Sequence, residues 1–148
     1  MSQPTFMQLA LEEARAAAAR GEVPIGCVIV QGGEVVARAG NRTLADRDPT
    51  GHAEILAIRE AARVLGTERL TGCDLYVTLE PCTMCAAAAS FARVRRLYFG
   101  ASDPKGGAVE SGVRFYDSAA CHHRPEVYGG IGEAECAALL REFFAARR

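Results

Sequence analysis

The chain has 148 residues, of which 49% are hydrophobic and 24% charged, the balance of one globular domain large enough to bury a core. Its net charge of −1 excludes a broad basic field as the basis of nucleic-acid binding. No apolar run reaches bilayer length, and Glu12, Glu13 and Arg15 interrupt any signal-peptide core in residues 1–20, so we expect a cytoplasmic single domain over 1–148 without a membrane segment.

The first half of the chain predicts two helices around a pair of strands. Apolar spacing and two glutamates favour a helix over about 5–20, ended by a glycine. The segment VPIGCVIVQGGEVVARAGN, residues 23–41, predicts two strands joined at its paired glycines. A polar loop ending in DRDPTG follows, and a second helix is expected over 52–65.

The second half predicts two further strands and two further helices. Strands are expected over 74–80 and 95–101, and a helix over 81–92 with Pro81 in its first turn. A last helix is expected over 133–147. Strands that alternate with helices indicate an α/β fold whose sheet is covered on both faces.

The six cysteines fall into different environments, and in a reducing compartment they are thiols or metal ligands. Cys27, Cys73 and Cys136 lie in apolar or alanine-rich surroundings and are expected to be small buried hydrophobes. Cys82 and Cys85 are three residues apart, which on a helix places both thiols on one face. By itself this spacing also fits a redox pair or a structural zinc site.

His52 and Glu54 lie at the start of the second helix, where a histidine just before the first turn can share a site with a carboxylate two residues later. Together with Cys82 and Cys85, His52 makes three protein ligands, the number typical of catalytic zinc. A carboxylate beside a zinc-bound water can take its proton and pass it on. We therefore predict one zinc ion per chain, with Glu54 as the proton-transfer group.

The other two histidines, His122 and His123, follow Cys121 directly. No further ligand pattern accompanies them, so a loop with polar packing roles is favoured over a second metal site. One of the two could instead supply a fourth ligand to the first zinc and close it as a structural site.

The segments HAE and PCTMC form the H-x-E…P-C-x-x-C signature of zinc nucleobase deaminases. With EVPIG, GNRT, DPTGHAEI, LYVTLEPCTMCAAA, YFGASDPKGGA and ECAALLREFF, the chain resembles the bacterial tRNA-specific adenosine deaminases of the cytidine/deoxycytidylate deaminase superfamily over nearly its whole length. It departs from them at Gly51, where alanine is common, and in the segment VRFYDSAACHHRPEVYGG.

The resemblance implies a cytidine-deaminase-like α/β/α sandwich with a central mixed sheet of about five strands. It implies zinc held by His52, Cys82 and Cys85, and water deprotonated by Glu54 for attack on C6 of adenine. It also implies a homodimer that grips a flipped-out nucleotide of the tRNA anticodon stem-loop and makes inosine at the wobble position.

Four residues are expected at the target base. The amide of Asn41 both donates and accepts, so it can read a purine edge, and the resemblance favours this role over an ordinary turn. The backbone N–H of Ala53 is expected to face the developing tetrahedral centre. Val23 and Ile25 are expected to wall the ring, a role compatible with strand packing.

Four further residues are expected to contact the RNA beside that base. The resemblance assigns Asp103 to a ribose hydroxyl and Lys105 to a phosphate, although SDPKGG alone indicates only a turn. Phe144 and Arg147 can form a stacking and phosphate-contacting end to the last helix. Core packing is an equal alternative for one of Phe143 and Phe144.

Two other functions remain open from the sequence. A deaminase of a free nucleobase or nucleoside, of guanine or cytosine type, would share the zinc motif and Glu54 but need no RNA surface. A non-catalytic, zinc-stabilised RNA-binding module would instead hold its zinc with four protein ligands.

Overall fold

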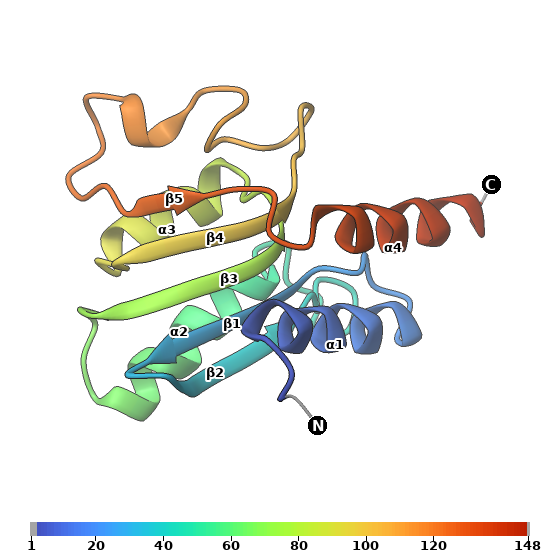
Figure 1. Cartoon of the computed structure of the whole chain (residues 1–148), viewed down its shortest axis with the longest axis horizontal. Coiled ribbons are helices and arrows are strands. Elements are labelled where there is room, and N and C mark those ends of the chain that lie inside the picture. Colours follow the sequence, from blue (N-terminus) through green and yellow to red (C-terminus); the bar gives the residue numbers. More distant parts are fainter. Residues whose placement is uncertain (1–2, 148) are drawn as a thin grey trace.

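The computed structural model describes residues 3–147, which form one five-stranded sheet with helices on both faces (Figure 1). Its strands are β1 (Gly26–Gln31), β2 (Glu34–Gly40), β3 (Cys73–Leu79), β4 (Arg96–Ala101) and β5 (Glu126–Tyr128). Its helices are α1 (Phe6–Ala19), α2 (Ala53–Leu65), α3 (Thr83–Phe91), α4 (Glu133–Ala145) and a 3₁₀ turn over Phe115–Asp117. None of these helices is long and apolar enough to span a membrane.

The sheet is mixed, with the strand order β2-β1-β3-β4-β5. β1 is antiparallel to both β2 and β3, whereas β3, β4 and β5 run parallel. The carboxyl ends of β3 and β4 therefore meet at one edge, and the loops that leave them at Glu80 and Ser102 start side by side.

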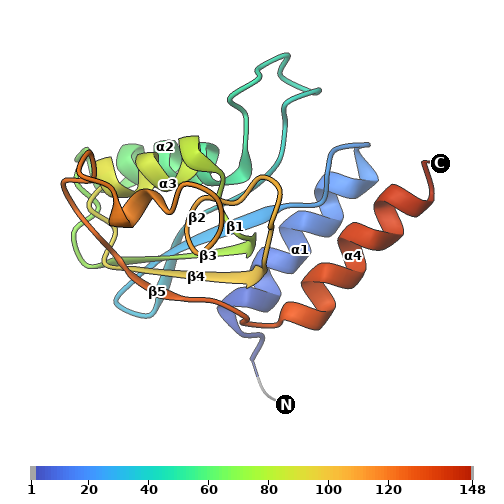
Figure 2. The same ribbon diagram turned by 90° about the horizontal axis from the view of Figure 1, so that it is seen from above.

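Two apolar layers fill the space between the sheet and the helices. On one face, α2 and α3 pack through small residues such as Ala57 and Ala89 against Leu75, Leu97 and Phe99. On the other face, α1 packs against β1, β2 and β3, and α4 packs against β3 and β4, so the two helices lie side by side (Figure 2). This arrangement confirms the predicted α/β/α sandwich.

Local signals place most element ends where the sequence predicts them. Thr5 caps α1 in a reciprocal capping box with Gln8, and Gly66 ends α2 in the left-handed conformation with φ of 69°. The hairpin between β1 and β2 turns at Gly32 and Gly33, which both have positive φ. Cys27, Cys73 and Cys136 are all buried, as expected.

The end of β3 and the start of α3 differ from the prediction, and α4 ends at Ala145, two residues before its predicted end. β3 ends at Leu79, so Glu80 lies beyond the strand. The helix begins at Thr83 because Cys82 is extended, with φ of −71° and ψ of 175°, and caps it; Pro81 therefore lies outside the first turn. The short strand β5 was not located by the sequence pattern, because its three residues are too few to show alternation.

Candidate active site

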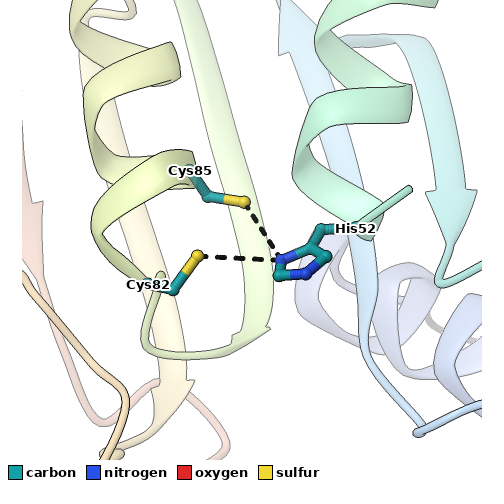
Figure 3. Close-up of side chains that lie close together, drawn as sticks. All are labelled: His52, Cys82 and Cys85. Atoms are coloured by element: carbon teal, nitrogen blue, oxygen red, sulfur yellow. Dashed lines mark hydrogen bonds between the residues drawn. The ribbon is translucent and has the colours of Figure 1, made fainter. Parts of the chain in front are cut away.

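The N-termini of α2 and α3 bring three metal-binding side chains together from segments 30 residues apart (Figure 3). His52 is the N-cap of α2, Cys82 is the N-cap of α3, and Cys85 lies in the first turn of α3. The Nδ1 atom of His52 is 3.7 Å from Sγ of Cys82 and 3.6 Å from Sγ of Cys85. All three ligand atoms lie within 4.8 Å of one another.

These distances test directly whether the three side chains fit zinc. Tetrahedral zinc with Zn–S of about 2.3 Å and Zn–N of about 2.05 Å requires a nitrogen–sulfur separation of about 3.6 Å. The two observed separations of 3.6 and 3.7 Å match it. One imidazole nitrogen and two thiolates are also the donor set of a catalytic zinc site, so the residues fit a single ion with an open fourth position.

The two cysteines differ in acidity because they interact with each other. The neighbouring Cys85 side chain, the Cys85 backbone N–H and His52 lower the pKa of Cys82 to about 5, although burial acts in the opposite direction. The same contact and burial raise the pKa of Cys85. A cation held between them would keep both side chains as thiolates, since cysteine ligands must be deprotonated.

Glu54 lies in the first turn of α2 and is only 4% exposed. Burial, with the negative charge of Cys82 as a smaller cause, raises the pKa of this carboxyl to about 7. A nearby cation would oppose the shift, because it favours the carboxylate. The side chain is therefore a buried carboxyl beside the three metal-binding residues, the placement that the predicted general acid–base role requires.

The alternative of a zinc closed by four protein ligands is wrong for the described part of the chain. Within residues 3–147, only His52, Cys82 and Cys85 form a group that can hold a metal. His123 is instead directed to the carbonyl oxygen of Val94, at 2.8 Å from its Nε2. The segment at Cys121 forms no second metal group in this range either.

Asn41 and Ala53 contact each other. The Oδ1 atom of Asn41 accepts a hydrogen bond of 2.8 Å from the N–H of Ala53. In this conformation the N–H of Ala53 is thus directed to Asn41, and its predicted contact with the developing tetrahedral centre stays a prediction. Asn41 is 6% exposed, and no fully buried side-chain nitrogen or oxygen among residues 3–147 lacks a partner, so its NH₂ group reaches solvent as a free donor.

A groove of about 470 Å³ brings together three of the predicted substrate residues. Val23, Asp103 and Phe144 all line it, at the edge where β3 and β4 end against α4. Ile25 does not line this groove; it packs against the core on the α2 and α3 face, because that side of the chain turns toward the helices. The prediction that Val23 and Ile25 wall the target ring stays a prediction, since this groove contains Val23 but not Ile25.

The two phenylalanines near the end of α4 differ in burial, which shows which of them serves core packing. Phe143 is 8% exposed and packs inward, whereas Phe144 is 48% exposed. The guanidinium carbon of Arg147 lies 3.5 Å from the centre of the Phe143 ring, so it stacks on the buried ring and not on Phe144. Lys105 is exposed in the turn after Asp103, whose Oδ1 accepts its backbone N–H at 3.3 Å.

Sequence reasoning missed two buried carboxylates, Glu22 and Glu80, which are 1% and 2% exposed. Glu22 accepts bonds from Thr43, Leu44 and Ala45 in the loop before His52. Glu80 accepts bonds from the loop that carries Asp103 and Lys105, as described below. Only their position beside apolar strand residues signals them, and that does not separate a buried acid from a surface one.

Comparisons with known proteins agree with this geometry. Residues 1–101 match the family model of the cytidine and deoxycytidylate deaminase zinc-binding region. The tRNA-specific adenosine deaminase of Agrobacterium fabrum (strain C58 / ATCC 33970) is 65% identical over 143 residues, which covers 97% of this chain and 94% of that protein.

Two solved structures are also similar. One, from biochemical and structural studies of A-to-I editing by tRNA:A34 deaminases at the wobble position of transfer RNA, has a TM-score of 0.90 at 66% identity and covers 91% of this chain and 98% of that one. Another, a guanine deaminase from Nitrosomonas europaea, has a TM-score of 0.78 at 28% identity and covers 98% of this chain and 86% of that one.

The fold and the three-ligand site define a zinc-dependent deaminase, in which a buried glutamate accompanies one zinc per chain. Within that class, the 65% identity over 97% of the chain determines the family. The chain belongs to the tRNA-specific adenosine deaminase family.

Proposed function

We propose that this protein hydrolyses adenosine to inosine at the wobble position of tRNA, with the anticodon stem-loop as its substrate. The observation that carries the proposal is the 65% identity with a tRNA-specific adenosine deaminase over 97% of the chain. The predicted ligands and Glu54 meet at one point of this shared fold, which gives the proposal a chemical basis.

The net reaction converts adenosine and water into inosine and ammonia. His52, Cys82 and Cys85 would hold zinc, which when bound supplies Lewis-acid activation of water. The carboxylate of Glu54 takes a proton from the attacking water and returns protons to the purine ring and to the departing amine. Its burial keeps bulk water from competing for this proton.

The NH₂ group of Asn41 is proposed to donate to an acceptor on the purine edge. The bond from Ala53 engages the amide oxygen, which leaves the NH₂ group to donate. Ala53 thus acts through Asn41, and Ile25 supports the strand behind it. A purine nitrogen acceptor in this position fits adenine.

The groove at Val23, Asp103 and Phe144 is proposed to take nucleotides that flank the target. Asp103 has one carboxylate oxygen, Oδ1, committed to its own turn, which leaves Oδ2 for a ribose hydroxyl. Phe144 offers an exposed ring for stacking, and Lys105 and Arg147 supply positive charge for phosphates.

Comparison of four substrates tests this function: an anticodon stem-loop, its form with deoxyribose next to the target, free adenosine and free guanine. The expected order of kcat/KM places the stem-loop far above free adenosine, because remote contacts hold the base for attack. Sequencing of treated tRNA should read the wobble adenosine as guanosine.

A free-base deaminase is the second candidate, because the guanine deaminase from Nitrosomonas europaea shares the fold at a TM-score of 0.78. Guanine turning over faster than the stem-loop, with no effect of Asp103→Asn or Lys105→Ala, would support it and exclude the tRNA function.

We further infer a homodimer that forms through the outer face of α2 and α3. Ile55, Ile58, Ala88 and Phe91 line an apolar groove of about 420 Å³ there, and Phe91 is 74% exposed. Exposed apolar surface of this kind is typical of protein contacts. Light scattering should give twice the chain mass for wild type and a shift toward the monomer for Phe91→Asp; a monomeric wild type contradicts the inference.

A single domain over 1–148 and a cytoplasmic location are proposed with this function. One continuous sheet that unites the described residues, 3–147, supports the first, and the tRNA substrate supports the second. A single cooperative unfolding transition and cell fractionation test the two points separately.

A further inference from the structure

Glu80 is a buried carboxylate at the exit of β3 with five hydrogen-bond donors around it. Its Oε1 accepts the N–H of Asp103 at 3.0 Å and the hydroxyl of Ser111 at 3.0 Å. Its Oε2 accepts the backbone N–H groups of Val109, Glu110 and Ser111 at 3.1, 2.8 and 2.9 Å. A carboxylate has about four lone-pair sites, so this group is saturated.

All five donors belong to the two ends of one loop, residues 103–111, which folds around the carboxylate. The loop closes on itself through a bond of 2.8 Å from the N–H of Gly107 to the carbonyl oxygen of Asp103. A Cβ at Gly107 would lie 2.7 Å from Oε1 of Glu80 and 2.6 Å from that same carbonyl. Only glycine fits there, so the KGG sequence is adapted to the presence of Glu80.

The same strand exit also leads to the metal-binding helix. Glu80 lies two residues before Cys82, and its own N–H is bonded to Ala101 at the end of β4. The carbonyl of Pro81 accepts the N–H of Ala108 at 2.9 Å, which ties the loop to the start of α3 a second time. The position of Asp103 and Lys105 relative to the active site is therefore fixed through this one short segment.

We propose that Glu80 is a positioning residue for RNA recognition: it holds the 103–111 loop in the conformation that presents Asp103 and Lys105 to the nucleotides beside the target base. It touches neither substrate nor reacting atoms and acts through the loop. The inference rests on the proposed tRNA function and extends it, because it assigns RNA affinity to a residue buried beneath the contact surface.

The test is Glu80→Gln in the zinc-containing protein, measured by direct binding of an anticodon stem-loop. The amide keeps the shape of the carboxylate but turns an NH₂ group toward backbone N–H donors, so the hydrogen bonds to one of the two former carboxylate oxygens are lost. We expect the Kd for the RNA to rise about tenfold, the size of a coupling between interacting residues. The single-turnover rate of deamination of the bound RNA should change much less, and the zinc content should stay at one ion per chain.

Two readouts separate positioning from general loss of stability. Because Lys105 would no longer meet its phosphate, the slope of log Kd against log salt should fall by about one in Glu80→Gln. Lys105→Ala should weaken binding strongly in wild type but little in the Glu80→Gln background. Val30→Ala, a buried residue at the opposite end of β1, is the matched control; it should lower Tm without changing the salt slope or the Kd.

Ser111→Ala provides a second variant should Glu80→Gln fail to fold, because it removes only one of the five donors. It should shift Kd in the same direction by a smaller factor. If Glu80→Gln or Ser111→Ala folds and binds the RNA with the Kd and salt slope of the wild type, the inference is overturned. The proposed function still stands in that case, provided that the wild-type protein deaminates the stem-loop. Failure of the wild type to deaminate the stem-loop overturns the proposed function itself.

Discussion

Three buried glutamates show how one residue type takes different roles through its surroundings. Burial is the main influence on the pKa of Glu54 and raises it to about 7. Burial also acts to raise the pKa of Glu80 and Glu22, but hydrogen bonds from loop N–H groups outweigh it and hold both values below 4.5. The first carboxyl is suited to exchange protons, and the other two remain charged acceptors.

Glu54→Gln should keep the fold and the zinc but lose nearly all deaminase activity. The amide has nearly the same shape as the carboxyl, but it cannot accept a proton from water. General acid–base groups contribute on the order of 10²–10⁴-fold, so kcat should fall by at least that range. Single-turnover kinetics on a stem-loop, with zinc measured in the same sample, provides the test; a near wild-type rate with full zinc would show that Glu54 has another role.

Glu22→Gln should reduce stability in a way that depends on pH. A carboxyl whose folded pKa is lowered stabilises the folded protein above its unfolded pKa of 4.5, and this contribution is lost as pH falls through the folded pKa. At pH 7 the variant should therefore be less stable by about 1–3 kcal/mol, the cost of unmade buried bonds. Urea unfolding of both proteins should show the difference shrinking below about pH 4; an equal difference at pH 7 and pH 3 would contradict the charged state of Glu22.

At the scale of elements, direct backbone contact determines how α1 sits on the sheet. Gly26, at the start of β1, faces the middle of α1, where an added Cβ would lie 2.6 Å from the backbone nitrogen of Ala14. Small residues on this helix, Ala10 and Ala14, are completely buried against the strand. The helix therefore approaches β1 more closely than side chains larger than alanine allow.

Gly26→Ala should destabilise the protein by more than about 3 kcal/mol, because the backbone of α1 at Ala10 and Ala14 leaves the methyl group no room. Gly33→Asn is the matched control: Gly33 lies in the hairpin turn with φ of 79° and nothing within 4 Å of an added Cβ, and asparagine tolerates this conformation. Denaturant unfolding should separate the two by several kcal/mol. Equal stabilities would mean that α1 can move away from β1 at little cost.

At the scale of the whole molecule, the candidate zinc site joins α2 and α3, which cover the same face of the sheet (Figures 2 and 3). The loops that reach the site come from the ends of β2, β3 and β4. The metal group and the residues proposed for base recognition and RNA contact are thus collected at one end of the sheet.

Removal of metal should lower the Tm of the whole domain. A ligand that binds only the folded state stabilises it by about 2.7 kcal/mol when the free ligand concentration is a hundred times the Kd. Because the metal would join the N-termini of α2 and α3, its loss should destabilise the whole domain. Calorimetry with and without chelator measures it, and added zinc should restore the Tm. Cys82→Ser should abolish the response to chelator, whereas Cys121→Ser, a thiol outside the metal group, should keep it; no response in wild type would count against resident zinc.

Local chemistry allowed the sequence to predict the helices, the first four strands and the three residues that the structure groups as a metal site. Helix caps, paired glycines and the three-residue separation of Cys82 and Cys85 act within a turn or two of chain, so their consequences can be read without the fold. The position of His52 and Glu54 around a helix N-terminus is of the same kind.

Tertiary structure alone decided which residues are buried acceptors and which contact surfaces exist. Glu80 and Glu22 differ from surface glutamates only because loops distant in sequence donate to them, and the bond between Asn41 and Ala53 spans two elements. The opposite exposure of Phe143 and Phe144 likewise depends on how α4 meets the sheet. Such roles depend on long-range contacts that form only when the chain closes, so no local pattern can encode them.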